Sequence, residues 1–169
     1  MDAAAYGFVG TLVGAIVGAS ASVITTFIGA WNTVRLQQKA NDLQRVERTR
    51  AFQRDTLIQL QDSLQDAMRN MGRMHYEDVL AFRKSGSWHK SKISEEVNQN
   101  FLSTNRDLSI LTERIADDDL RNDVKIMRNK ILEALSAGSE VESVLTLEQA
   151  AVFFNDVMEH IGKVLRGNY

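Results

Sequence analysis

The sequence contains no cysteine and no proline, and only three of its 169 residues are histidine. Without cysteine the chain can form neither a disulfide framework nor a thiolate metal site. Proline is the strongest helix breaker and a common turn former, so its absence favours long helices. These absences favour an all-α fold and leave few side chains for nucleophilic or metal chemistry.

Charge is also missing from one long stretch, because residues 3–34 contain no Asp, Glu, Lys, Arg or His. An uncharged apolar run of this length is typical of a membrane-spanning helix. Tyr6 and Trp31 lie near its two ends, about 37 Å apart along a helix, and both ring types prefer the interface between lipid and water. No basic residue precedes the run, and it is longer than the apolar core of a signal peptide. We therefore interpret it as a retained transmembrane helix with two interfacial anchors.

Basic residues cluster directly after this predicted span. Residues 35–54 carry six basic and two acidic side chains, although the net charge of the whole chain is −2. Basic flanks of membrane helices stay in the cytoplasm, so the asymmetry predicts a single-pass protein of the cell membrane with its amino terminus outside and its large domain in the cytoplasm. The residues predicted to contact lipid headgroups are Arg35, Lys39, Arg45, Arg48 and Arg50.

Membrane lipids are a better match to this basic segment than nucleic acid. Acidic Asp42 and Glu47 are interspersed among the basic residues, and no aromatic stacking platform accompanies them. Nucleic acid is therefore not an expected partner.

Small residues recur every four positions within the predicted span and would form one stripe along the helix. Such a stripe lets two helix backbones approach closely in lipid. The sequence thus predicts packing against copies of the same chain, with another membrane or cytoplasmic protein as the alternative partner. The predicted packing residues are Gly10, Gly14, Gly18, Ser22 and Thr26. The hydroxyl groups in the span are expected to bond to helix backbone rather than to line a pore.

Neither glycine nor proline lies between Ala30 and Asn70, so the helix is expected to continue beyond the membrane. Apolar residues follow a heptad repeat there, which fits either a parallel coiled coil or the core face of an intramolecular bundle. Arg50 and Gln53 interrupt the repeat and favour the bundle at that point. The heptad residues are Leu36, Leu43, Val46, Leu57, Leu60, Leu64, Ala67, Met71 and Met74.

Three more amphipathic helices are predicted after a turn at residues 85–87. One covers residues 93–116, the next starts at the acidic run 117–119 and stops at Gly138, and the last ends at Gly167. A short turn is expected before the last helix, because Ser139 and Thr146 both start a capping-box pattern. The sequence therefore predicts an all-α chain with three parts. They are a transmembrane segment (1–34), a basic juxtamembrane helical stalk (35–56) and a cytoplasmic antiparallel bundle of about four helices (57–169).

Residues able to carry out chemistry are scarce. Asp156 and His160 have the spacing of two metal ligands on one helix face, but no second helix with matching ligands exists, so a solvated face is the better interpretation. A glycine-rich phosphate loop, a nucleophile elbow and an HExxH motif are also missing from the sequence. We predict no catalytic, metal-binding or cofactor-binding residues, and hence no enzyme.

Two functions remain after these exclusions. The first is an oligomeric scaffold, adaptor or signalling subunit that acts through helix–helix interactions. The alternative is an oligomeric membrane effector or pore-forming protein of the phage-lysis or antiviral-defence type. The two differ in whether assembly of the spans opens a path for ions.

Overall fold

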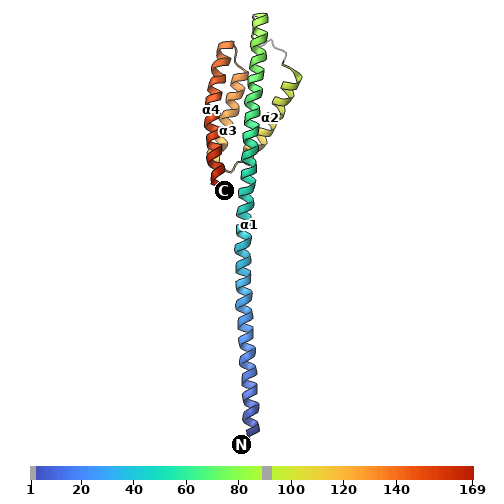
Figure 1. The fold of residues 1–169 in the computed structure, drawn as a ribbon, viewed down its shortest axis with the longest axis vertical. Helices are drawn as coiled ribbons and strands as arrows, with labels where there is room; N and C mark the ends of the chain where they lie inside the picture. The colour runs from blue at the N-terminus through green and yellow to red at the C-terminus, as the bar shows by residue number, and fades with distance from the viewer. Residues whose placement is uncertain (1–2, 89–92) are drawn as a thin grey trace. The chain divides into compact units, whose positions relative to one another are not determined.

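The computed structural model describes the backbone of residues 3–88 and 93–169. Within these residues the chain forms four α-helices and no strand (Figure 1). The prediction of an all-α fold with about four helices is confirmed. The helices are α1 (Ala3–Ser85), α2 (Glu95–Arg114), α3 (Asp118–Leu135) and α4 (Glu140–Gly167).

The chain divides into two compact units, Met1–Arg48 and Thr49–Tyr169, and α1 contributes to both. The predicted continuation of the first helix is confirmed, because α1 has no break between Ala3 and Ser85. Its long stretch without glycine or proline removes the residues that most often end or kink a helix. The second unit contains the bundle.

The end of α1 is set by a glycine in the left-handed conformation. Gly86 has φ of +68°, and its N–H donates to the carbonyl oxygen of Phe82 at 2.8 Å. This geometry is a helix-ending motif that a residue with a side chain adopts only with strain. The predicted turn chemistry at residues 85–87 therefore ends the helix as expected.

Side-chain caps begin the other three helices. The hydroxyl of Ser94 accepts from Val97 N–H, the carboxylate of Asp117 accepts from Leu120 N–H at 2.8 Å, and Ser139 caps α4 in the same way. Each cap satisfies one of the N–H groups that a helix start leaves without a partner. The predicted role of the acidic run 117–119 as a helix start is confirmed.

Two sequence-based boundaries differ from the structure. The third helix ends at Leu135 with Ser136 as its cap, so Gly138 is not its stop. Instead the Gly138 N–H donates to the Glu142 carboxylate at 2.8 Å, which forms part of the next helix start. Thr146 caps nothing, because its hydroxyl donates to the Glu142 carbonyl oxygen inside α4. A single start at Ser139 therefore replaces the expected short turn.

The core of the bundle comes from one face of each helix. On α1 the heptad positions from Leu57 to Met74 are buried, and three of them, Leu57, Leu60 and Leu64, have no exposed surface. Fully burying one such side chain stabilises a fold by roughly 1.5–3 kcal/mol. The other buried apolar residues of the core cluster are Leu108, Leu111, Ile115, Leu120, Val124, Met127, Ile131, Ala134, Ala150, Val157 and Ile161.

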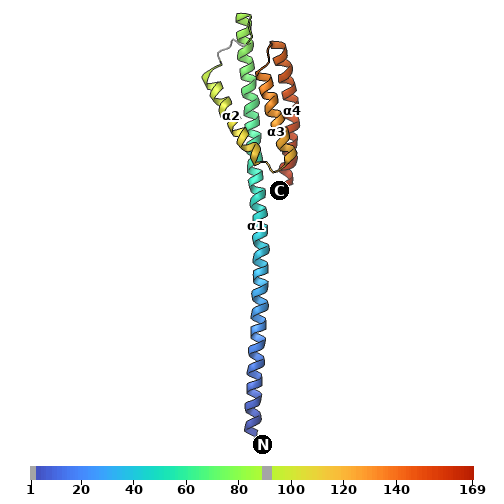
Figure 2. The same cartoon turned by 180° about the vertical axis from the view of Figure 1, so that it is seen from behind.

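Helices α1 and α4 run antiparallel within the second unit. Arg54 Nη1 donates to the Asn168 carbonyl oxygen at 2.7 Å at one end, and His75 Nδ1 lies 2.8 Å from Ser143 Oγ at the other. Helices α3 and α4 lie side by side, as the view from behind shows (Figure 2). Trp88 closes the end near His75, with its Nε1 donating to the Ala137 carbonyl oxygen at 2.8 Å.

Candidate functional site

Helix α1, which begins in the first unit, is long and apolar enough near the amino terminus to cross a membrane. Large apolar side chains are exposed along it, among them Val17, Val23 and Phe27, each with more than 60 % of its surface accessible. A helix with apolar residues on all sides has a favourable environment in hydrocarbon rather than in water. This segment is the first candidate functional surface.

The predicted small-residue stripe is open along its length. Gly10, Gly14 and Gly18 lie in regular helix, and a Cβ atom added at any of them would meet no heavy atom within 4 Å. Ser22 and Thr26 continue the stripe and are exposed. The stripe therefore offers a smooth surface on which another backbone could pack closely.

The hydroxyl groups near this stripe bond to their own helix. Ser20 Oγ donates to the Ile16 carbonyl oxygen and Thr26 Oγ1 to the Ser22 carbonyl oxygen, both at 2.8 Å. Thr33 Oγ1 does the same toward Gly29 at 2.9 Å. For these three side chains the expected bonding to helix backbone is confirmed, and their donor hydrogens are not directed toward a water-filled channel.

An aromatic pair precedes the first basic residue. The rings of Phe27 and Trp31 have centroids 6.4 Å apart, and Trp31 is 66 % exposed. With Val34 and Arg35 they line one shallow hollow of the helix surface. Aromatic rings followed by a guanidinium group suit the boundary between acyl chains and headgroups. The side chain of Tyr6, the anchor predicted for the other end, lies outside the described residues.

The residues predicted to contact lipid headgroups are all on the solvent-accessible surface. Arg35, Lys39, Arg45 and Arg48 belong to the first unit, and Arg50 to the second. Between them the heptad residues Leu36, Leu43 and Val46 are 67 %, 68 % and 48 % exposed. The same repeat that forms the bundle core thus carries exposed apolar side chains in the first unit.

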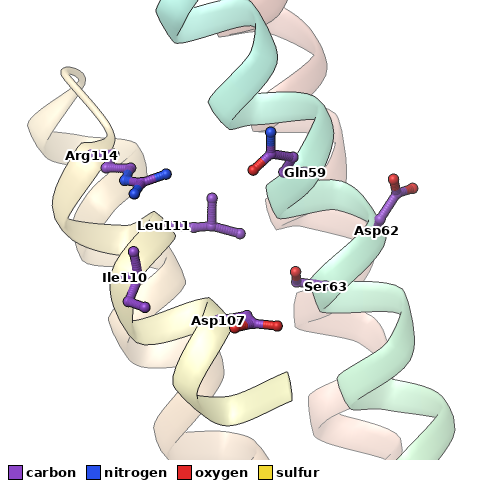
Figure 3. A pocket seen from close by; sticks show the side chains of 7 residues that line it. All are labelled: Gln59, Asp62, Ser63, Asp107, Ile110, Leu111 and Arg114. Carbon is purple, nitrogen blue, oxygen red and sulfur yellow. The ribbon is translucent and has the colours of Figure 1, made fainter. Parts of the chain in front are cut away.

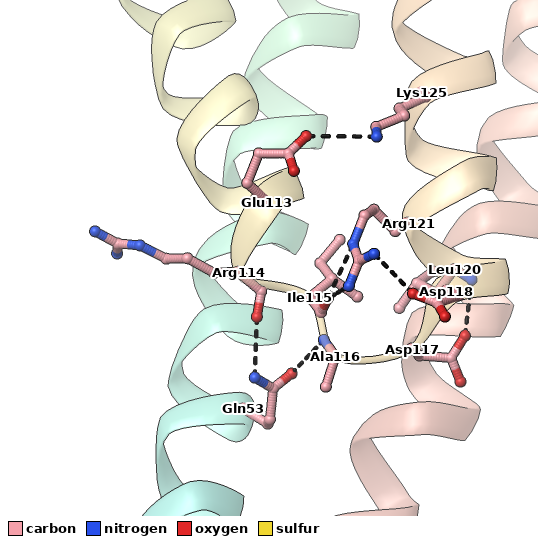
Figure 4. A network of polar contacts seen from close by, with 10 residues as sticks. All are labelled: Gln53, Glu113, Arg114, Ile115, Ala116, Asp117, Asp118, Leu120, Arg121 and Lys125. Atoms are coloured by element: carbon pink, nitrogen blue, oxygen red, sulfur yellow. Dashed lines mark hydrogen bonds and ion pairs between the residues drawn. The ribbon is translucent and has the colours of Figure 1, made fainter.

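In the second unit, Gln53 fastens α1 to the connection between α2 and α3 (Figure 4). Its amide donates to the Arg114 carbonyl oxygen at 2.9 Å and accepts from Ala116 N–H at 3.0 Å. Gln53 is 8 % exposed, so a residue that interrupts the heptad repeat is buried with both ends of its amide satisfied. Sequence reasoning did not find this contact, because it joins residues 61 and 63 positions apart.

Charged groups hold the same connection from its other side. The Arg121 guanidinium donates to the Ile115 carbonyl oxygen and pairs with Asp118 at 2.7 Å. Lys125 and Glu113 link α3 to α2 at 3.4 Å. These side chains link α2, the connection and α3, and they line none of the cavities described here. We assign them a structural role.

A polar groove lies between α1 and α2 (Figure 3). One cavity of about 410 Å³ is lined by Asp62 of α1 and by Asp107, Ile110 and Arg114 of α2, among others. A second cavity of about 340 Å³ shares Asp107 and is lined largely by polar residues. Among the described residues no group of three or more His, Asp or Glu side chains could hold a metal ion.

Two histidines of the described residues, His75 and His160, have structural partners. His160 Nδ1 lies 2.8 Å from Asp123 Oδ2 on α3, so its partner is across the helix pair rather than Asp156 one turn away. His75 is within hydrogen-bond distance of Ser143. A serine beside a histidine resembles a nucleophile paired with its general base. Ser143 is only 3 % exposed, however, and it lines none of the cavities described above. This arrangement ties α1 to α4.

The chain has no significant match among protein-family profiles, curated proteins or solved structures.

Proposed function

We propose that this chain is a single-pass membrane protein that assembles with copies of itself and uses its helical bundle as a cytoplasmic scaffold, adaptor or signalling subunit. The observation that carries the proposal is the open stripe of Gly10, Gly14 and Gly18 on an apolar helix. Close backbone approach along such a stripe supplies the van der Waals packing that drives helix association in lipid.

Two further features support this proposal. Leu36, Leu43 and Val46 extend the heptad repeat with exposed apolar side chains, which suits a parallel pairing that continues beyond the membrane. The basic residues from Arg35 to Arg50 support a cytoplasmic bundle and contact with anionic headgroups, at roughly 1 kcal/mol per residue close to the surface.

The mass of the intact protein in nanodiscs tests this assembly. Gly14→Leu and Gly18→Leu place bulk on the stripe and should reduce the oligomer to monomer. Ala19→Leu places the same leucine side chain on a different face of the helix and should leave the mass unchanged. A parent protein that is already monomeric, or an oligomer that tolerates both glycine substitutions, would contradict the proposal.

The pore-forming alternative is distinguished by ion leakage from vesicles. The hydroxyls of Ser20 and Thr26 already donate to carbonyl groups one turn earlier, which leaves less polarity for a channel lining. We therefore expect vesicles that contain the oligomer to retain a trapped dye and a potassium gradient. Leakage that disappears in the Gly14→Leu variant would favour the effector instead.

A further inference from the structure

Helix α4 has two apolar faces. One packs into the bundle core through Ala150, Val157 and Ile161, which are at most 1 % exposed. The other, here called the outer face of α4, consists of Val141, Val144, Leu145 and Val152, which are 81 %, 41 %, 54 % and 65 % exposed. A helix packed on one side only normally presents a polar opposite side.

The spacing of these residues makes them one surface. Positions 141, 144, 145 and 152 fall within about 100° of arc on a helix of 3.6 residues per turn. A hollow of about 440 Å³ lies along the same side, lined by Leu145, Val152 and Phe153 of α4 and by Lys130 of α3, among others. The Lys130 ammonium lies 5.6 Å from the Phe153 ring centroid and closes one edge of the hollow. Exposed apolar side chains gathered on one side of a helix in this way are typical of interaction sites.

Apart from Lys130 of α3 at one edge of the hollow, the charged residues of this part of α4 are acidic. Residues 139–156 contain four acidic side chains, Glu140, Glu142, Glu148 and Asp156, and no Lys or Arg. Glu148 lies on the outer face itself, between Leu145 and Val152. An apolar stripe with acidic residues at its centre and rim is complementary to a helix that is apolar on one side and basic on its flanks.

A second copy of this chain is a poor occupant of the face. The contacts of Ser143 with His75 and of Asn168 with Arg54 place the first half of α4 about 30 Å along α1 from Arg54, at 1.5 Å per residue. A second copy that runs parallel to the first would therefore bring its own outer face to the same position along α1. Glu148 on each face and Asp156 beside it would then approach the same residues of the other copy, and like charges brought together in this way repel.

We propose that the outer face of α4 docks a basic amphipathic helix of a partner protein. This inference rests on the adaptor role proposed above and names the kind of partner that the adaptor receives. Docking would bury the valine and leucine side chains beneath the apolar side of the incoming helix. A lysine or arginine at the border of its apolar side would meet Glu148, and one on its flank would meet Asp156, which fixes the orientation of the helix on the face.

The test uses the full chain in nanodiscs of zwitterionic lipid, with a fluorophore on a cysteine introduced by Asn155→Cys. Because the natural sequence has no cysteine, the label reports from that one place. The probe is a synthetic helix of about five turns, with leucine on one side and lysine on both flanks. Its control is the same peptide with glutamate in place of lysine, and empty nanodiscs give the background from lipid.

The basic peptide should bind saturably and roughly tenfold or more tightly than its acidic twin. The double variant Leu145→Ser and Val152→Ser keeps every charge and should lose roughly tenfold or more of that affinity. The double variant Leu102→Ser and Ile110→Ser removes exposed apolar side chains from α2 and should leave it unchanged. Equal binding of both peptides, or binding that survives the α4 substitutions, would overturn the proposal.

The same preparations separate this inference from the proposed assembly. The α4 variant should keep the oligomeric mass of the parent, whereas Gly14→Leu should change the mass and leave peptide binding intact. If the fluorescence of the label changes on addition of excess unlabelled protein but not of the peptide, the face is a contact between copies. That result would refute the docking proposal.

Discussion

Gln53 allows a quantitative test of how α1 is held in the bundle. Gln53→Met keeps a side chain of similar length but removes both amide contacts, to the Arg114 carbonyl oxygen and the Ala116 N–H. Each hydrogen bond contributes about 1 kcal/mol, and leaving buried partners unsatisfied adds to the loss. We therefore expect the free energy of unfolding of the bundle to fall by about 2–3 kcal/mol.

Urea unfolding of the full chain in mild detergent, followed by the fluorescence of Trp88, measures this loss. The measurement is made in a Trp31→Phe background, because the chain has only two tryptophans and Trp31 lies in the first unit. With a slope of roughly 1–3 kcal/mol per molar urea, the midpoint should fall by about 0.7–3 M.

The matched control is Gln65→Met, which makes the same substitution at an exposed position of α1. It should shift the midpoint little, because exposed substitutions usually change stability by less than about 0.5 kcal/mol. Equal shifts for Gln53 and Gln65 would refute the reasoning that the buried amide fastens α1 to the connection between α2 and α3.

Three further predictions concern the second unit. Leu64→Ala should destabilise the bundle by about 2–5 kcal/mol in the same urea assay, whereas Leu43→Ala should leave its midpoint unchanged, because Leu64 is fully buried and Leu43 is 68 % exposed. Asp117→Ala removes the cap of α3 and should lower the free energy of unfolding by about 0.5–2 kcal/mol. Asp117→Asn should keep most of the stabilisation, because an asparagine side chain also caps a helix. The hydrogen bond and charge of Lys163 hold the pKa of Glu159 below its ordinary value, so their stabilising effect is present at neutral pH and lost as the pH falls through that lowered pKa. An NMR titration should show the pKa of Glu159 returning toward its ordinary value in Lys163→Gln, and an unchanged pKa would contradict the pairing.

The fold was largely predictable because its helices are specified locally. Heptad spacing located the α1 core positions from Leu57 to Met74, and Asp117 marked a helix start through its own side chain. Thr146 was misinterpreted because the capping-box pattern also occurs inside helices, where the hydroxyl bonds back to an earlier carbonyl group.

The polar contacts of the bundle could not be predicted in the same way. From the sequence alone, Gln53 is recognisable only as an interruption of the heptad repeat, because its partners lie in a connection more than 60 residues later. The pairing of His160 with Asp123 competes with a closer candidate, Asp156, and only the packing of α3 against α4 decides between them. Such contacts depend on tertiary structure rather than on local spacing.

The residues of the bundle core are synthesised in chain order, and its first and last members are far apart in the sequence. The first contribution is the α1 seam from Leu57 to Met74, and the last is Ile161 of α4, 87 residues after Met74. At translation rates of about 5–20 residues per second, that seam waits roughly 4–17 s for its final partner. During this interval leucine and methionine side chains destined for full burial face water on a nascent chain. Efficient production of this protein should therefore depend on chaperones that shield the seam until α4 has left the ribosome.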